Sequence, residues 1–293
     1  MRYPLSGVIP VDKPPGVSSR RVVDAVARAL GMKTVGHAGT LDPLASGVVV
    51  VCVGHATKLV DYLHELPKHY SSLFLLGRSS PSDDFETPIE VEENPVRPTQ
   101  DEIEAAAAMF RGEISQRPCD YSAVHVGGKR AYRLARQGTP VEIASKAVRI
   151  DRLEITGYDW PRLGLDIVCS SGTFVRAIGR DLAAALGTAA VMESLVRTAV
   201  GPFTLERCLP LGQVTPEAAQ AALLPAIEAV PDMPRHLLAA EDLDRAVLGG
   251  LVSLPADSAD ALVAVDEVGD LVGILKRHES GRFRLRPNFR GEG

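Results

Sequence analysis

The feature that most constrains the fold is a glycine-rich loop, residues 36–47 (GHAGTLDPLASG), that leads directly into the apolar run 48–53 (VVVVCV). A short, mostly β-branched run between Gly47 and Gly54 is typical of a buried central strand. The loop holds one carboxylate, Asp42, beside a proline. Asp before Pro often starts a turn, so Asp42 is compatible with a structural turn or with a carboxylate held rigidly where a ligand can reach it.

The composition is that of a globular protein with a sizeable core. The chain has 293 residues, of which 45% are hydrophobic and 24% charged, and no apolar run approaches the roughly 20 residues needed to span a membrane. The first residues lack the apolar core of a signal peptide. Four scattered cysteines without a CxxC pair favour neither a disulfide framework nor a zinc site, and they fit a reducing cytoplasm.

The net charge of −5 is weak evidence against nucleic acid as a partner, but the distribution of charge matters more than its sum. Basic residues gather within 129–149 and within 276–290, whereas acidic residues gather within 83–104. Local basic patches on a mixed surface are therefore compatible with a nucleic-acid partner.

Periodicity and capping signals predict the elements. Helices are expected over about 20–30, begun by Ser18 or Ser19 and ended by Gly31, and also over about 57–64, 99–112, 130–136, 174–186 and 189–196. Strands are expected over about 48–53, 68–76, 148–157, 164–169, 261–266, 271–276 and 282–286. Because this order lacks a regular βαβ alternation, it predicts an α+β fold with a mixed sheet and a small C-terminal β domain.

A second candidate site is the stretch 169–176 (CSSGTFVR), in which a strand end and a tight loop precede a helix that Thr173 is expected to cap. Arg176 falls in the first turn of this helix, where a cation is unfavourable for the helix dipole. Either Arg176 is an ordinary surface arginine, or it has an anionic partner nearby. Asp42 is available as that partner.

The other candidates also have a structural alternative, which is the commoner one for such residues. Tyr70 is either core packing or a pocket wall, Asp84 lies in an acidic loop, and His37 has no second histidine at metal-ligand spacing. In the segment 116–138, cations alternate with aromatic residues, a pattern that suits phosphate binding and base stacking or, alternatively, an exposed hairpin and helix.

Several blocks in one order resemble the bacterial tRNA pseudouridine-55 synthases of the TruB type. They are KPPGVSS (13–19), GHAGTLDPLASGVVVV (36–51), KHY (68–70), QRPCDYSAVHVGGKRAYRLARQG (116–138), CSSGTFVRAIGRDLAAALG (169–187), LVRT (195–198) and VGPF (200–203). The C-terminal stretch is similar to the small PUA domain of many members. The chain departs from the usual motifs at Ala38 and Ser46, and it has Ser171 and Phe174 where Lys-Gly-Thr-Tyr is common.

The resemblance implies roles for individual residues. Asp42 would be the nucleophile, Arg176 its partner, and Tyr70 a group that stacks on the target base and takes part in proton transfer. His37 would help to displace the flipped base, Asp84 would contact the target region, and Leu195 would line the pocket. The remaining residues assigned to substrate and RNA are Phe174, Lys58, Lys129, Arg130, Tyr132 and Arg136.

The resemblance also implies an organisation and an activity. Residues 1–210 would form the catalytic domain, with an RNA-binding excursion at about 113–145, residues 211–235 a linker with a helix, and residues 236–290 a PUA-like RNA-binding domain. The expected enzyme is a cytoplasmic monomer that acts on the T stem-loop of tRNA. It is expected to need no obligatory protein partner, no membrane, no metal and no cofactor. Two alternatives stay open: a non-catalytic RNA-binding or tRNA-folding module, and an RNA-guided relative acting on ribosomal RNA.

Overall fold

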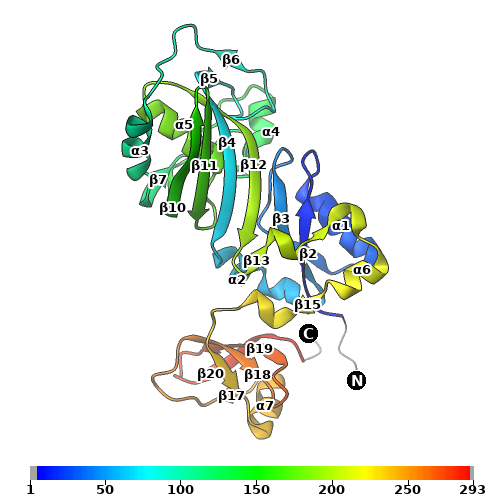
Figure 1. The fold of residues 1–293 in the computed structure, drawn as a ribbon. Helices are drawn as coiled ribbons and strands as arrows, with labels where there is room; N and C mark the ends of the chain where they lie inside the picture. The colour runs from blue at the N-terminus through cyan, green and yellow to red at the C-terminus, as the bar shows by residue number, and fades with distance from the viewer. Residues whose placement is uncertain (1–4, 291–293) are drawn as a thin grey trace.

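The computed structural model describes residues 5–290, which form a large mixed sheet with helices packed against it and a smaller C-terminal sheet (Figure 1). The strand order along the large sheet is β14-β1-β3-β12-β4-β11-β10-β7, with β2, β13 and β15 paired at its side. Both parallel and antiparallel pairs occur, since β3 is antiparallel to β1 and parallel to β12. The predicted α+β class is confirmed. No helix within residues 5–290 is long and apolar enough to cross a membrane.

The strands of the large sheet are β1 (Gly7–Lys13), β2 (Val35–Ala38), β3 (Ser46–Val53), β4 (Lys68–Leu76), β7 (Gly112–Gln116), β10 (Lys146–Asp159), β11 (Arg162–Cys169), β12 (Ala190–Val200), β13 (Phe203–Thr204), β14 (Leu209–Pro210) and β15 (Leu224–Pro225). The helices are α1 (Ser19–Leu30), α2 (Val60–Glu65), α3 (Gln100–Ala108), α4 (Ala131–Arg136), α5 (Val175–Ala185), α6 (Pro216–Ala221) and α7 (Ala240–Val247). Short 3-10 helices are η1 (Gly54–Leu59), η2 (Leu205–Arg207), η3 (Leu211–Gln213) and η4 (Ala226–Ala229).

The apolar run 48–53 forms most of β3, and all six of its side chains are buried. This confirms the predicted central strand, because β3 lies between β1 and β12. Gly47, which directly precedes the run, has a φ of +103°, and a Cβ there would lie 2.2 Å from the carbonyl oxygen of Arg197. Only glycine therefore allows β3 to approach β12 so closely at this point.

Most of the predicted helices and their signals are confirmed. Ser18 caps α1 by accepting a hydrogen bond from the backbone N–H of Arg21, and Gly31 ends this helix in the left-handed conformation. A capping box of Thr99 and Glu102 begins α3. Helices α3 and α5 contact each other, and they pack on β10 and β12 respectively. They therefore cover one face of the part of the large sheet that runs from β12 to β10 (Figure 1).

Two local predictions are wrong. Residues 190–200 form the strand β12 instead of a helix, because they pair along almost their full length with β4 and also with β3. Met192 and Leu195 have helical spacing, but the β-branched residues of this stretch suit a strand, and the sheet contacts decide the outcome. Thr173 does not cap α5: the N-cap is Phe174, and the Thr173 hydroxyl donates to the carbonyl of Ser170.

Two segments lie outside the regular sheet. Residues 117–145, which follow β7, contain a small hairpin, β8 (His125–Val126) and β9 (Lys129–Arg130), followed by α4, whose predicted position is confirmed. The first residues of the predicted excursion, 113–116, belong instead to β7 of the large sheet. The segment has its own small apolar cluster around Ala131, Val141 and Ile143. Another short hairpin pairs β5 (Arg78–Ser79) with β6 (Glu90–Val91).

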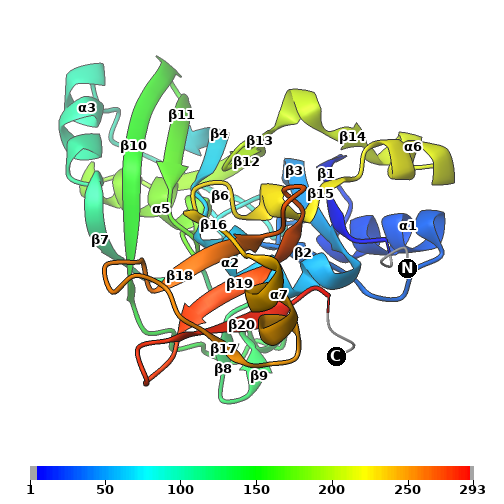
Figure 2. The same ribbon diagram turned by 90° about the horizontal axis from the view of Figure 1, so that it is seen from below.

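Residues 211–235 pack against the large sheet, since β15 pairs with β1 and α6 contacts α1. The C-terminal sheet has the order β16-β18-β19-β20-β17, with β16 (Arg235–Leu237), β17 (Leu251–Val252), β18 (Ala261–Val265), β19 (Leu271–Arg277) and β20 (Phe283–Asn288), so its three predicted strands are confirmed. Figure 2 shows this sheet from below, and the ammonium of Lys276 on β19 lies over the ring of Tyr62 on α2. An apolar cluster that includes Leu59, Val263 and Phe289 joins the two sheets.

Candidate active site

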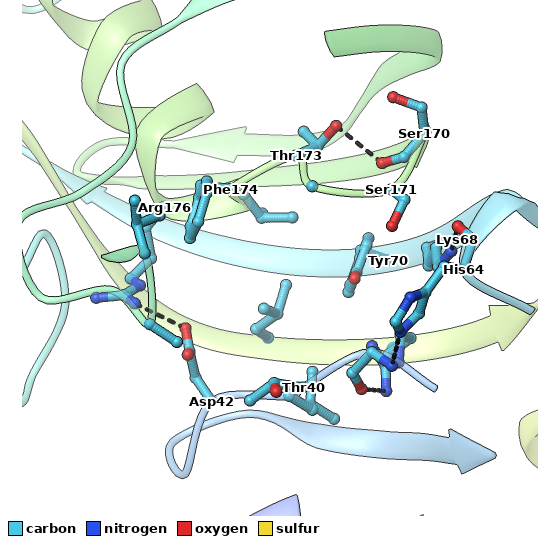
Figure 3. A pocket seen from close by; sticks show the side chains of 18 residues that line it. Thr40, Asp42, His64, Lys68, Tyr70, Ser170, Ser171, Thr173, Phe174 and Arg176 are labelled. Carbon is cyan, nitrogen blue, oxygen red and sulfur yellow. Dashed lines mark hydrogen bonds and ion pairs between the residues drawn. The ribbon is translucent and has the colours of Figure 1, made fainter. Parts of the chain in front are cut away.

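A cavity of about 330 Å³ opens where the loop after β2 meets β4, β12 and the start of α5 (Figure 3). Its walls come from segments that are far apart in the sequence. The lining residues are Gly39, Thr40, Leu41, Asp42, His64, Lys68, Tyr70, Ala123, Val124, Ser170, Ser171, Gly172, Thr173, Phe174, Val175, Arg176, Leu195 and Arg197. The volume falls within the range of roughly 300–1,000 Å³ that is usual for small-molecule sites.

The centre of this cavity is an ion pair between Asp42 and Arg176. Arg176 Nη2 lies 2.9 Å from Asp42 Oδ2, with the Arg176 side chain 3% exposed and that of Asp42 37% exposed. The guanidinium also donates to the carbonyls of Ser82 and Tyr121, at 2.8 and 3.0 Å. The anionic partner predicted for Arg176 is therefore Asp42, and a buried cation holds a carboxylate that still faces the cavity.

A second carboxylate, Asp84, lies on the other side of the same guanidinium. Asp84 Oδ2 is 3.2 Å from Arg176 Nη1, and its side chain is 3% exposed. Burial lowers the pKa of Arg176, but the attraction of Asp42 and the neighbouring acidic groups outweighs burial and raises it. Arg176 is thus fixed as a cation. Asp84 is behind Arg176 and does not line the cavity.

The loop that carries Asp42, residues 39–45, is held by side chains of distant elements. Ser19 Oγ accepts from the N–H of Leu41 at 2.9 Å and donates to its carbonyl at 3.0 Å. The fully buried ammonium of Lys13 donates to the carbonyls of Pro43 and Ala45. We call residues 39–45 the Asp42 loop. Its backbone has little freedom, so it presents the carboxylate in one place.

Arg197 and His64 hold the beginning of the Asp42 loop. Arg197, which is 1% exposed, donates from Nη2 to the carbonyl of Gly39 at 3.1 Å and from Nε to the carbonyl of Val48 at 2.7 Å. The N–H of Gly39 donates to His64 Nε2 at 3.0 Å. Arg197 therefore connects the loop to the first residues of β3.

Comparison with known proteins matches the sequence of this chain to one family. The family described as "TruB family pseudouridylate synthase (N terminal domain)" matches residues 27–175. A protein named "tRNA pseudouridine synthase B" from Caulobacter sp. (strain K31) is 40% identical over 271 residues, which cover 91% of this chain and 87% of that protein. This chain belongs to the TruB family. The resemblance predicted from the ordered blocks is confirmed.

Further relatives agree with this assignment. A protein of the same name from Mycobacterium tuberculosis (strain ATCC 25618 / H37Rv) is 38% identical over 289 residues, with 96% of each chain covered. Among solved structures, a chain of the "Crystal Structure of a Cbf5-Nop10-Gar1 Complex" has a TM-score of 0.75 and covers 97% of this chain and 85% of its own, at 22% identity. That similarity shows a common fold.

Three further predicted residues of this TruB-family chain line the cavity. Tyr70 projects from β4, and burial raises the pKa of its phenol. Leu195 projects from β12, and Phe174 precedes α5. The backbone N–H and C=O of Phe174 are both bonded to the Gln116 side chain, at 2.8 and 3.1 Å. These residues supply apolar and aromatic walls around Asp42.

The other predicted residues lie outside the cavity lining. His37 is half-buried on β2, and its Nδ1 is buried without a hydrogen-bond partner. Lys58 is on η1, where its Nζ lies 3.4 Å from the carbonyl of Asn288 in the C-terminal sheet. The remaining predicted contacts lie on the hairpin β8–β9 and on α4, and they are Lys129, Arg130, Tyr132 and Arg136.

Four residues that build the site carried no predicted role in it: Lys13, Ser19, His64 and Arg197. Three of them lie within the blocks that carried the resemblance: Lys13 and Ser19 in KPPGVSS, and Arg197 in LVRT. The blocks showed that these residues belong to a pattern, but they did not show which groups the side chains contact. His64 carried no signal, because its partner Gly39 is known only from the tertiary structure. Within residues 5–290, no group of three or more His, Cys, Asp or Glu side chains is placed to hold a metal ion.

Proposed function

We propose that the protein isomerises a uridine of tRNA, at position 55 of the T loop, to pseudouridine, with Asp42 as the nucleophile. The observation that carries this proposal is the Asp42–Arg176 ion pair in the lining of a cavity, in a chain of the TruB family. The loop that carries Asp42 is held by four other side chains. The names of the relatives at 38–40% identity support tRNA as the substrate.

The reaction needs no oxidant or group donor. The C1′–N1 bond of uridine breaks, the uracil turns, and a C1′–C5 bond forms, while C5 loses a proton and N1 gains one. The Asp42 carboxylate attacks either C1′ of the ribose or C6 of the base. In the first route it resembles the carboxylate nucleophile of glycoside cleavage. Both routes require the Asp42 carboxylate to lie next to the bound nucleotide.

The target base must leave its stack to reach Asp42, which costs a few kcal/mol. The aromatic ring of Tyr70 and the side chains of Phe174 and Leu195 form apolar walls that favour an extruded base. Stacking on an aromatic ring contributes about 1–3 kcal/mol, which offsets part of that cost. Burial raises the pKa of the Tyr70 phenol, so it is protonated at neutral pH, as an ordinary tyrosine is, and we propose that it takes part in the proton transfer.

RNA binding is assigned to the surface around the cavity. The excursion at about 113–145 contributes exposed cations beside Ala123 and Val124, which line the cavity.

We further propose that residues 1–210 form the catalytic domain and that the C-terminal sheet, within 236–290, binds RNA as a PUA-like domain. In this proposal residues 211–235 join the two, and the protein acts as a cytoplasmic monomer without an obligatory protein partner. His37 would take part in displacing the base.

The test is incubation with an unmodified tRNA transcript that contains 5-tritiated uridine. We expect the wild type to release tritium and to form pseudouridine at position 55 without guide RNA or a second protein. Asp24→Asn, a control on α1 whose carboxylate pairs with Arg20 away from the cavity, should do the same. Asp42→Asn should bind the transcript with unchanged affinity and release none. Product from Asp42→Asn would remove Asp42 from its role. A requirement for guide RNA would favour the RNA-guided relative. Binding of the transcript without turnover would favour the tRNA-folding module.

A further inference from the structure

Both backbone polar groups of Gly39 are hydrogen-bonded to side chains. Its carbonyl accepts from Arg197 Nη2 at 3.1 Å, and its N–H donates to His64 Nε2 at 3.0 Å (Figure 3). Gly39 has a φ of +80° and begins the Asp42 loop. These two contacts therefore fix the direction in which the chain enters the loop that carries the carboxylate.

His64 is itself held in place. It lies in the last turn of α2, and its ring lines the cavity. The Lys68 ammonium donates to the carbonyls of His64 and Leu66, at 2.5 and 2.6 Å, and thereby ties the end of α2 to the start of β4. The hydrogen bond to Gly39 thus comes from a rigid part of the molecule.

We propose that His64 is a positioning residue, whose neutral imidazole accepts the Gly39 N–H and so sets the place of the Asp42 carboxylate. This inference rests on the function proposed above. A neutral imidazole has one nitrogen that accepts a hydrogen bond, whereas an imidazolium has none. Protonation of His64 therefore removes the acceptor and leaves two N–H groups facing each other.

The charged surroundings of His64 favour its neutral form. Burial lowers its pKa below the ordinary value of 6.5, and the Lys68 ammonium lowers it further, while Asp61 on the same helix acts in the opposite direction. His37 on β2 and Arg197 on β12 face the same region, and Asp42 and Tyr70 line the cavity with His64. The loop contact is present at pH 7 and is lost as the pH falls through the pKa of His64.

The experiment measures the single-turnover rate on the tRNA transcript between about pH 5 and pH 8, the range in which histidines titrate. His64→Gln places an amide oxygen that accepts a hydrogen bond but does not titrate. His64→Leu removes the acceptor. His69→Gln is the matched control, because His69 is a half-buried histidine whose pKa is also lowered but which does not line the cavity.

We expect the wild-type rate to fall at acid pH and His69→Gln to behave in the same way. His64→Gln should keep the neutral-pH rate and lose the acid-side decline. His64→Leu should be about tenfold slower at neutral pH, as the loss of one partly buried hydrogen bond predicts, with unchanged tRNA affinity. An acid-side decline retained in His64→Gln, or a wild-type rate in His64→Leu, would overturn the inference.

A second measurement does not depend on activity. The amide resonance of Gly39, observed by NMR in protein labelled with ¹⁵N-glycine, should titrate with His64 in the wild type and in His69→Gln but stay constant in His64→Gln. A Gly39 amide insensitive to pH in the wild type would overturn the role of His64, whatever the activity. Absence of tritium release from the wild type, together with a titrating Gly39 amide, would overturn only the proposed function.

Discussion

Asp42 and Asp84 share one buried guanidinium, that of Arg176. The distances to its two terminal nitrogens are 2.9 and 3.2 Å, yet the Asp42 side chain is 37% exposed and the Asp84 side chain only 3%. Asp84 therefore balances the buried cation from behind, whereas Asp42 reaches from it into the cavity. We therefore expect the two carboxylates to have separable effects, Asp84 on folding and Asp42 on the proposed chemistry.

Replacement of Arg176 tests this separation. Arg176→Met leaves the buried Asp84 carboxylate without its cation, and removal of one partner of a buried pair typically costs about 3–5 kcal/mol. We expect urea denaturation to show a loss of that order. A second substitution in the same protein, Asp84→Asn, should restore part of the stability but none of the activity, because Asp42 still lacks its partner. A double variant no more stable than Arg176→Met would contradict the assignment of the buried charge to Asp84.

Two adjacent serines offer a matched test of the Asp42 loop. Ser19 bonds both polar groups of the Leu41 backbone, whereas Ser18 caps α1 by accepting from Arg21. Each alanine substitution should cost about 1–2 kcal/mol in the free energy of unfolding. Only Ser19→Ala should also slow the single-turnover rate, because only Ser19 touches the loop that carries Asp42. Equal rates in the two variants would show that the loop does not need this clamp.

The ammonium of Lys13 predicts a pH dependence of stability. Burial lowers its pKa to about 8, against an ordinary value of 10.5. Between these values the unfolded chain binds the proton and the folded protein does not, so the contribution of Lys13 to stability rises with pH in that window. The free energy of unfolding of the wild type minus that of Lys13→Met should therefore increase from about pH 8 to pH 10. A constant or decreasing difference in denaturation measurements at both pH values would refute the lowered pKa.

Local physical chemistry predicted the centre of the site. The unfavourable place of Arg176 in the first turn of α5 indicated an anionic partner, and the loop before an apolar strand supplied Asp42. Both signals lie within short stretches of chain. They could be interpreted because each pattern fits few structures: a cation in the first turn of a helix needs an anion nearby, and a β-branched run suits a strand.

The contacts that hold the Asp42 loop could not be predicted in this way. Ser19, His64 and Arg197 act on backbone groups that are distant in the sequence, so neither spacing nor composition reveals their partners. The strand β12 was mistaken for a helix for the same reason, since its pairing with β3 and β4 outweighs the local pattern. Tertiary hydrogen bonds thus decide the part of the site that lies outside single motifs.

The cations of the excursion predict the salt dependence of tRNA binding. Lys129 is exposed on the hairpin, and no hydrogen bond or ion pair of its ammonium is found within residues 5–290, whereas Arg136 is already paired with Glu86 at 2.5 Å. A contact between a cation and an RNA phosphate releases counterions and contributes about 0.7–0.9 to the slope of log affinity against log salt. Lys129→Ala should therefore lower the slope by about that amount, while Arg136→Ala, which also frees Glu86, should change it less.

The same measurement separates binding from chemistry. At saturating tRNA, Lys129→Ala should turn over as fast as the wild type, because Lys129 does not line the cavity. Arg20→Ala is the control outside the excursion, since Arg20 is paired with Asp24 on α1, and it should leave both slope and rate unchanged. Filter binding at several salt concentrations gives the slopes. An unchanged slope in Lys129→Ala would place the bound RNA away from this hairpin and would move the proposed phosphate contacts to another face of the protein.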